Sequence, residues 1–232
     1  MTDTALDILP KHYTGLYKTE TSDSPDKSRT SLIRWIQEEA TKGLSKDVIL
    51  NIGSGPQPLE AQMLRSEHKD NSLFKKIKIF TLDIANIRSS NLLVQRRNRL
   101  KTRTDILHVQ GSAFELPYRD NSIGMVVSNH AIDFLPDEVF KEAYRVLAPN
   151  GLALFNFHHP SMIPEDLEKF NLHENVREFW KFLKDNNRLF DSEGRIKKTM
   201  EGYGFQVNSI NLNDDLIDKW WEVKLTKPAS MP

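Results

Sequence analysis

Three histidines follow apolar runs of the kind that form buried strands, where an imidazole can meet a ligand. His158 and His159 come directly after LALFNF, and His130 ends the run SIGMVVSNH. Imidazole titrates near neutral pH, so such a histidine can take a proton from a hydroxyl or an ammonium group, or anchor a substrate. All three are candidate catalytic residues, and His159 is also a candidate for substrate binding. For each, a hydrogen bond within a strand-end loop is the simpler alternative.

The sequence predicts no metal centre. The chain contains no cysteine, which excludes thiolate ligands, disulfides and cysteine nucleophiles. The adjacent histidines have no H-E-x-x-H pattern around them and no third ligand at a recognisable spacing.

A short glycine loop follows the apolar run Val48–Ile52 in VILNIGSGPQP. Gly53 and Gly55 allow positive φ angles and let a ligand approach the backbone, and a helix beginning after them would offer free N–H groups. Two glycines alone are weak evidence, and an ordinary tight turn explains them equally well. No Gly-Lys-Ser/Thr follows, so this is not a Walker A phosphate loop.

Asp83 ends the next apolar run, IFTLD. A carboxylate at the tip of a strand can accept two hydrogen bonds from ribose hydroxyls, as it does in dinucleotide folds. Asp83 lies further from Gly53 than the usual spacing of about 20 residues, and the polar insert 65–76 accounts for the difference. A helix-capping aspartate is the alternative.

The elements that position these residues alternate along the chain. Apolar runs that predict strands are separated by segments that predict helices, and this alternation favours a parallel sheet with helices on both faces. In such sheets, ligands bind at the carboxyl ends of the strands, near the reversal in strand order. The predicted strands lie at 48–52, 76–85, 105–111, 122–130, 152–157, 205–213 and 220–227, and the predicted helices at 28–43, 57–69, 135–151 and 164–203.

Two of these helices have recognisable ends. Ser28 or Thr30 can cap the start of the first helix, and Gly43 can end it. The helix within 135–151 is expected to continue to Asn150-Gly151.

Composition limits the class of protein. Charged residues make up 28% and hydrophobic residues 38%, and the formal net charge is zero, so nothing in the charge calls for nucleic acid or an anionic membrane. The N-terminus shows no apolar signal region, and no run approaches the roughly 18 apolar residues of a membrane span. We expect a cytoplasmic, globular protein.

Several blocks of the sequence together resemble a family. VILNIGSGP, IFTLDIA, HVQGSAFELPYRDNSIGMVVSNHAIDFLPD and EAYRVLAPNGLALFNF are similar, in order and spacing, to class I S-adenosylmethionine-dependent methyltransferases, most of all to the small-molecule branch. LPYRDNSI followed by RVLAPNG is the most specific part. The resemblance covers roughly residues 45–160. It implies an α/β, Rossmann-like, seven-stranded and mostly parallel sheet with an antiparallel last strand.

The resemblance also implies roles for particular residues, with S-adenosylmethionine as the cofactor. The glycine loop would lie against the methionine part, Asp83 would hold the ribose, and Ile84 would lie against the adenine. Asn129 and His130 would lie beside the methionine moiety and the substrate. The implied cofactor-binding residues are Asn51, Gly53, Ser54, Gly55, Asp83, Ile84, Ser112, Ala113, Phe114, Asn129 and His130.

Four positions depart from the family pattern. Asn51 and Ser112 stand where the family usually has acids, Gln57 replaces a third glycine, and Gly124 replaces an aspartate. Each lost charge-assisted hydrogen bond to the cofactor costs on the order of 1 kcal/mol, or roughly tenfold in affinity.

The resemblance suggests a division of the single domain 1–232. Residues 1–44 would form a lid, with Tyr13 and Tyr17 as substrate contacts; 45–160 would bind the cofactor; 161–200 would be a helical substrate cap; and 201–232 would supply the terminal strands. The basic stretch 96–103 either docks an anion or is a solvated surface.

The sequence therefore predicts an S-adenosylmethionine-dependent methyltransferase that methylates an oxygen or nitrogen atom of a small molecule or peptide by direct displacement. A catalytically inactive binding or scaffold protein with the same fold is the main alternative, and a nicotinamide-dependent oxidoreductase is a weaker one. The Asn/Asp-Pro-Pro-aromatic motif of nucleic-acid base methylation is absent, since SNHAID stands in its place.

Overall fold

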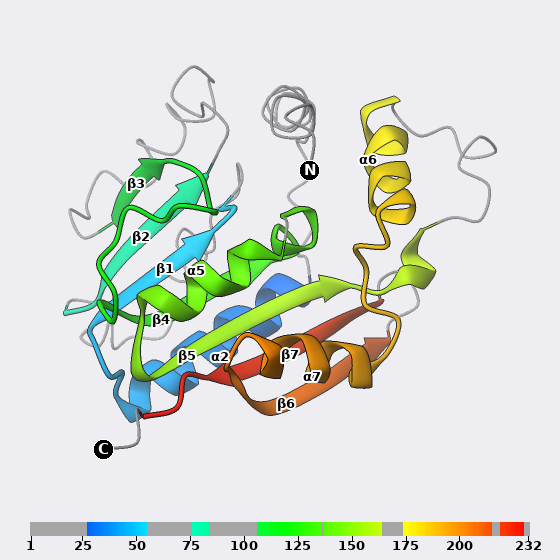
Figure 1. The fold of residues 1–232 in the computed structure, drawn as a ribbon. Coiled ribbons are helices and arrows are strands. Elements are labelled where there is room, and N and C mark those ends of the chain that lie inside the picture. Colours follow the sequence, from blue (N-terminus) through cyan, green and yellow to red (C-terminus); the bar gives the residue numbers. More distant parts are fainter. Residues whose placement is uncertain are drawn as a thin grey trace.

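A computed structural model describes residues 27–54, 76–83, 106–135, 137–163, 174–214 and 219–229 (Figure 1). Some of the predictions lie outside the described residues. They concern Tyr13, Tyr17, Gly55, Gln57, Ile84, the helix predicted at 57–69 and the basic stretch 96–103.

Seven strands form one sheet in the order β3-β2-β1-β4-β5-β7-β6. The pairs β1–β2, β1–β4, β2–β3 and β4–β5 are parallel, whereas β7 runs antiparallel to both β5 and β6. The predicted fold class is therefore confirmed. The strands are β1 Val48–Ile52, β2 Lys78–Asp83, β3 Ile106–Gln110, β4 Ile123–Asn129, β5 Leu147–His158, β6 Gln206–Asp214 and β7 Lys219–Thr226.

Helices cover both faces of the sheet (Figure 1). Leu32 and Ile36 of α2 pack against Ile49 of β1 on one face, and α5 and α7 pack on the other. None of the described helices is long and apolar enough to span a membrane. The helical elements are α2 Lys27–Lys42, η3 Ile132–Phe134, α5 Glu138–Val146, η4 Pro160–Met162, α6 Glu174–Asp185 and α7 Glu193–Gly202.

The central strands are buried on both faces, as parallel strands between helical layers should be. Six of the seven residues of β4 are buried, and four of the five residues of β1. This burial explains why both strands read as continuous apolar runs rather than as alternating patterns.

The start of α2 differs from the prediction. The helix already includes Lys27, so neither Ser28 nor Thr30 caps it. The hydroxyl group of Ser28 is buried and makes contacts across the fold, with Asn129 and His130. Gly43 does follow the helix end, with a φ of 97° and its N–H donating to the carbonyl of Ala40.

The end of α5 was also predicted wrongly. The helix stops at Val146, and β5 begins at Leu147, several residues before Asn150-Gly151. Leu147 pairs with Ile123 of β4 and is fully buried. Its apolar side chain fits either a helix or a strand pattern, and the strand pairing decides between them.

Gly124 explains one departure from the family pattern. A Cβ atom at this position would lie 1.9 Å from the carbonyl oxygen of Lys46, which passes directly beside β4. The glycine is therefore required by close backbone packing, whatever its effect on the cofactor.

Candidate functional site

The parallel strands bring the predicted site residues to one edge of the sheet. β1 pairs with β2 through Ile52 and Leu82, and β4 pairs with β5 through Asn129 and Asn156. Consequently the residues that follow β1, β2, β4 and β5 share the carboxyl edge, where open α/β sheets bind ligands.

The glycine loop is fixed tightly against this edge. The N–H groups of Gly53 and Ser54 both donate to the carbonyl of Leu82, at 2.8 and 3.3 Å. Gly53 has a φ of 67°, and a Cβ atom there would lie 2.1 Å from the Cβ atom of Ala131. Only glycine satisfies both conditions, so the turn after β1 is a built feature of this edge.

Asp83 is the last residue of β2 and is only 5% exposed. Its carbonyl oxygen accepts a hydrogen bond from the N–H of Gly111, which ties the loop after β3 to the end of β2. A buried carboxylate at this strand tip fits the role of holding ribose hydroxyls.

The loop after β3 holds the residues expected beside the adenine. The hydroxyl oxygen of Ser112 accepts a hydrogen bond from the N–H of Phe114 at 3.2 Å, so the side chain stabilises a local turn. Ala113 is buried within the main core, and Phe114 is half-buried.

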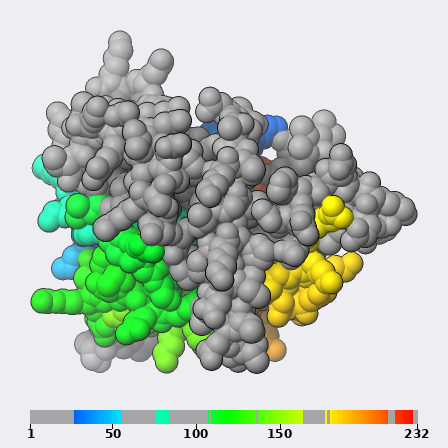
Figure 2. Space-filling view, turned by 90° about the horizontal axis from the view of Figure 1, so that it is seen from above, coloured from blue at the N-terminus to red at the C-terminus, as the bar shows by residue number. Residues whose placement is uncertain are grey.

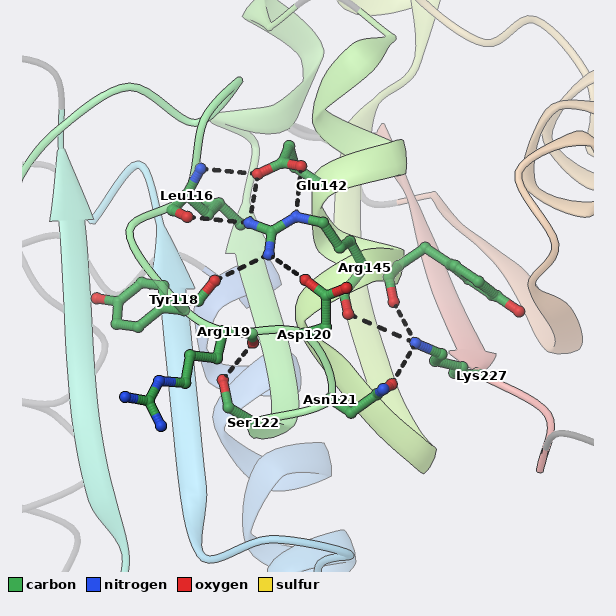
Figure 3. Close-up of polar contacts among 10 residues, drawn as sticks. Leu116, Tyr118, Arg119, Asp120, Asn121, Ser122, Glu142, Arg145 and Lys227 are labelled. Atoms are coloured by element: carbon green, nitrogen blue, oxygen red, sulfur yellow. Dashed lines mark hydrogen bonds and ion pairs between the residues drawn. The ribbon is translucent and has the colours of Figure 1, made fainter.

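A clamp centred on Arg145 holds the rest of this loop (Figure 3). The Arg145 guanidinium donates to the carbonyls of Leu116 and Tyr118 at 3.0 and 2.9 Å, and it pairs with Glu142 and Asp120. Glu142 in turn accepts the N–H of Leu116 at 2.8 Å. The most specific family-like motifs therefore meet in a structural clamp, which positions the loop that carries Ser112.

A polar network joins the N-terminal turn of α2 to the ends of β4 and β5. Asn156 donates to the side-chain oxygen of Asn129 and to the carbonyl of Ser28, both at 2.9 Å. The Ser28 hydroxyl donates to the same Asn129 oxygen at 3.3 Å and contacts Nε2 of His130 at 2.8 Å. Asn129 is thereby held in one orientation at the edge.

His130 and His158 come together, as their places after β4 and β5 predict. Their rings are stacked, with centroids 4.0 Å apart and planes tilted by 34°. Asp133, on η3, joins them: its Oδ2 accepts the backbone N–H of His158 at 2.9 Å and contacts Nδ1 of the same residue at 2.7 Å. Asp133 falls within the segment that follows β4, but the sequence assigns it no role, because its place in AIDFLPD has no metal or catalytic signature.

Burial shapes the protonation of this cluster. It lowers the pKa of His130 well below the usual range, and the neighbouring His158 lowers it further. Burial also raises the pKa of Asp133, against the opposing effect of its hydrogen bond with His158. His130 is therefore neutral at physiological pH.

His159 lies apart from the cluster. Its Nδ1 contacts the hydroxyl of Ser161 at 2.8 Å, and its ring packs beside Trp221, with centroids 5.7 Å apart. Burial lowers its pKa, and nearby Lys219 acts in the same direction. The structure thus brings two of the three predicted histidines together and places the third on the side of β7.

Apolar rings border the cluster on the side of α6. Trp180 lies edge-on to the ring of His158, with centroids 5.3 Å apart, and Phe134 lies 6.0 Å away. Phe134 packs with Leu183 of α6. In the view from above, α6 (yellow) lies on the right side of the molecule and the green residues between β3 and β5 lie on the left (Figure 2).

The strand order, the glycine loop and the buried acid agree with the comparison by sequence family. Residues 69–155 match a family described as a methyltransferase domain. This part of the chain is similar to methyltransferases, and solved structures that share the fold include a SAM-dependent methyltransferase. The cofactor that this similarity implies is S-adenosylmethionine, and the buried Asp83 at the end of β2 fits the role of holding its ribose.

Curated proteins that are similar to this chain match it over part of their length. The chain is 31% identical over 152 residues to the ubiquinone/menaquinone biosynthesis C-methyltransferase UbiE of Haemophilus ducreyi, a match that covers 58% of each chain. It is 32% identical over 149 residues to a demethylmenaquinone methyltransferase of Lactobacillus johnsonii, covering 56% of this chain and 57% of the relative. The chain therefore spans little more than half the length of these relatives.

Solved structures share the fold over a larger part of the chain. A SAM-dependent methyltransferase from Aquifex aeolicus superimposes with a TM-score of 0.59, covering 94% of this chain and 98% of that one at 15% identity. At this identity the likeness concerns the fold alone.

Proposed function

We propose that the chain transfers the methyl group of S-adenosylmethionine to a small molecule held against His130 and His158. One observation carries the proposal: the parallel register places Gly53, Asp83 and Asn129 on the same edge as this histidine pair. Methyl transfer is an in-line displacement, so the enzyme acts mainly by aligning the acceptor with the methyl group.

The cofactor would lie across the ends of β1, β2 and β4. Asp83 would accept hydrogen bonds from the ribose hydroxyls, and the turn at Gly53 and Ser54 would lie against the methionine part. Asn129, whose orientation is fixed by Asn156, would border the same part. Ser112, Ala113 and Phe114 would line the adenine side, as the family resemblance implies, and Asn51 would lie beneath the methionine part.

The acceptor would lie on the side of η3 and α6. We expect an oxygen or nitrogen acceptor, and we favour a molecule that carries a hydroxyl group, because His130 or His158 can act on it as a base. The Haemophilus ducreyi relative is named as a C-methyltransferase. A ring carbon becomes nucleophilic when a conjugated hydroxyl loses its proton, so a hydroxyl-bearing acceptor suits carbon as well as oxygen.

A catalytically inactive binding protein is the second candidate. The observation in its favour is the loss of negative charge at two places: Asn51 is an amide buried in β1, and the Ser112 hydroxyl is engaged in a turn. Gly124 no longer supports this reading, because packing against Lys46 requires a glycine there.

Calorimetry with S-adenosylmethionine and S-adenosylhomocysteine tests the proposal. We expect both to bind, and Asp83→Asn to weaken binding at least about tenfold through lost charge-assisted hydrogen bonds. Asp47→Asn is the matched control, because Asp47 is exposed in the loop before β1, at the opposite edge. Absence of binding at millimolar ligand would contradict the proposal.

Acceptors are then identified by the release of S-adenosylhomocysteine from a panel of hydroxylated aromatic and aliphatic small molecules. Mass spectrometry of the product locates the new methyl group on oxygen, nitrogen or carbon. Cofactor binding without transfer to any acceptor would favour the inactive binding protein.

A further inference from the structure

We propose that His130, Asp133 and His158 bind a divalent first-row transition-metal ion, with zinc as the ion to test. The site would lie on the acceptor side of the edge. The inference goes beyond the proposed function, since the methyltransferase family match assigns no metal to these residues.

The three side chains form a set of ligands of the right kind and size. Each offers one ligand atom, and these atoms lie within 4.8 Å of one another. Two ligand atoms of a tetrahedral zinc ion, each about 2.0–2.2 Å from the metal, lie about 3.4 Å apart. The side chains would therefore have to draw together by little more than about 1 Å to close around an ion. Two imidazoles and one carboxylate suit zinc or iron, whereas magnesium prefers oxygen ligands.

The hydrogen bonds around His130 determine which of its nitrogens is free. Asn156 donates to the Asn129 oxygen, so that oxygen is an acceptor, and the Ser28 hydroxyl also donates to it. The Ser28 oxygen then accepts from Nε2 of His130, which must carry the proton. Nδ1 of His130 is left with a lone pair, and it is buried without a hydrogen-bond partner in the described part of the chain.

Ser28 thus acts like the hydrogen-bond acceptors that surround the ligands of a metal ion: it accepts the N–H of the His130 nitrogen that would not bind the ion. A ligating histidine usually donates its other ring N–H to a neighbour, which fixes the tautomer and the ring orientation.

Asp133 supplies an independent observation. Its side chain has 0% exposure, and its Oδ1 has no hydrogen-bond partner among the described residues, whereas Oδ2 accepts the backbone N–H of His158 and contacts Nδ1 of the same residue. A buried carboxylate oxygen without a partner is costly, and a cation would satisfy it. Two of the three side chains in the cluster therefore present an unsatisfied ligand atom.

The surroundings favour a site that acts on a substrate. Three protein ligands leave at least one position for water or for an acceptor oxygen, as in catalytic zinc sites. The Phe134 and Trp180 rings beside His158 reduce the contact of the site with water. A hydroxyl bound to the ion would lose its proton more readily, which would prepare it for methylation.

Calorimetry with zinc chloride on the chelator-treated full chain tests the site. We expect one ion per chain with a micromolar or lower Kd, and no comparable binding of magnesium. His130→Gln, Asp133→Asn and His158→Gln should each weaken zinc binding at least tenfold. His159→Gln is the matched control, because it removes the adjacent histidine, whose ring lies outside the cluster, and should leave the Kd unchanged.

A fourth variant keeps all three ligands. Ser28→Ala removes the acceptor for Nε2 of His130, and we expect it to weaken zinc binding about tenfold. X-ray absorption of the zinc-loaded chain should show nitrogen and oxygen ligands at about 2.0–2.2 Å. Thermal melts and S-adenosylhomocysteine binding verify that each variant is folded.

The inference is overturned if the folded chain binds no zinc, or if the ligand variants and His159→Gln bind it equally. A chain that binds S-adenosylhomocysteine but not zinc would leave the proposed function standing and assign the histidine pair to proton transfer instead.

Discussion

Arg145 and Glu142 form a two-point ion pair on α5, with Nε to Oε1 and Nη2 to Oε2 both at 2.7 Å. The same guanidinium reaches the carbonyls of Leu116 and Tyr118, so a single residue joins α5 to the loop after β3. This relationship gives the most family-specific stretches a structural role: they set the position of the loop that carries Ser112, which the proposed function assigns to the cofactor.

Arg145→Lys should destabilise the fold and weaken cofactor binding together. Lysine keeps the charge but cannot make the two-point pair or reach both carbonyls. We expect a loss of about 1–3 kcal/mol in the free energy of unfolding, from urea denaturation, and a higher Kd for S-adenosylhomocysteine. Arg119→Lys is the control, because the Arg119 side chain points away from the clamp (Figure 3). Equal effects of the two variants would argue against the clamp.

The clamp should also make stability depend on acid pH. The hydrogen bonds from Arg145 lower the pKa of Glu142 in the folded chain, so its contribution is fully present above the pKa that the group has when unfolded. That contribution is lost as the pH falls through the folded pKa. Unfolding free energies of the wild type and Glu142→Gln should therefore converge as the pH falls below the ordinary glutamate pKa of 4.5. The exposed Glu115→Gln should show no such convergence.

Gly53→Ala should lower both stability and cofactor affinity. The new Cβ would meet the Cβ of Ala131, and the residue would be held at a positive φ, which alone costs about 1–2 kcal/mol. Gly43→Ala separates the two effects, because Gly43 also has a positive φ but has open space where a Cβ would stand. We expect the larger loss at Gly53, measured by thermal melting and S-adenosylhomocysteine binding.

A second substitution tests the clash directly. Ala131→Gly in the Gly53→Ala background removes the atom that the new Cβ meets, so it should restore part of the stability and part of the affinity. Strictly additive effects of the two substitutions would show that the contact with Ala131 does not matter.

The sheet could be predicted from the sequence because each strand carries a signal that tertiary contacts do not override. Val48–Ile52 was predicted to the residue, since an apolar run bounded by polar residues and a glycine turn leaves little freedom. The end of α5 could not be predicted, because Leu147 suits the inner face of a helix and a buried strand equally, and only its pairing with Ile123 distinguishes them.

Only the site residues that lie at the ends of strands could be predicted from the sequence. Asp83 and His158 end strands and His130 directly follows one, so the alternation of elements was sufficient to place them at one edge. Asp133 lies on a short helix that no pattern in the sequence singles out, and Ser28 reaches the edge from a distant helix. Such contacts depend on how the layers pack, which the spacing of residues along the chain does not encode.

Restoring the usual family acid at position 124 should destabilise the protein rather than strengthen cofactor binding. A Cβ there would lie 1.9 Å from the carbonyl oxygen of Lys46, so Gly124→Asp should destabilise the fold by more than about 3 kcal/mol or prevent its recovery in soluble form. Gly124→Ala should be similarly harmful, because the first side-chain carbon is the cause. A stable Gly124→Asp variant with tighter cofactor binding would contradict this reading and favour loss of function at this position.

Restoring the usual family acid at position 112, in contrast, should strengthen cofactor binding without destabilising the protein. The side chain of Ser112 is half-exposed, and its oxygen accepts the N–H of Phe114, a hydrogen bond that an aspartate at the same position can also accept. The second carboxylate oxygen would be free for the adenine amino group, so Ser112→Asp should tighten S-adenosylhomocysteine binding roughly tenfold with little change in melting temperature. Ser112→Asn keeps the shape without the charge and should give a smaller gain. Calorimetry with S-adenosylhomocysteine on the wild type, Ser112→Asp and Ser112→Asn measures these differences. Unchanged or weaker binding by Ser112→Asp would place the adenine away from this loop.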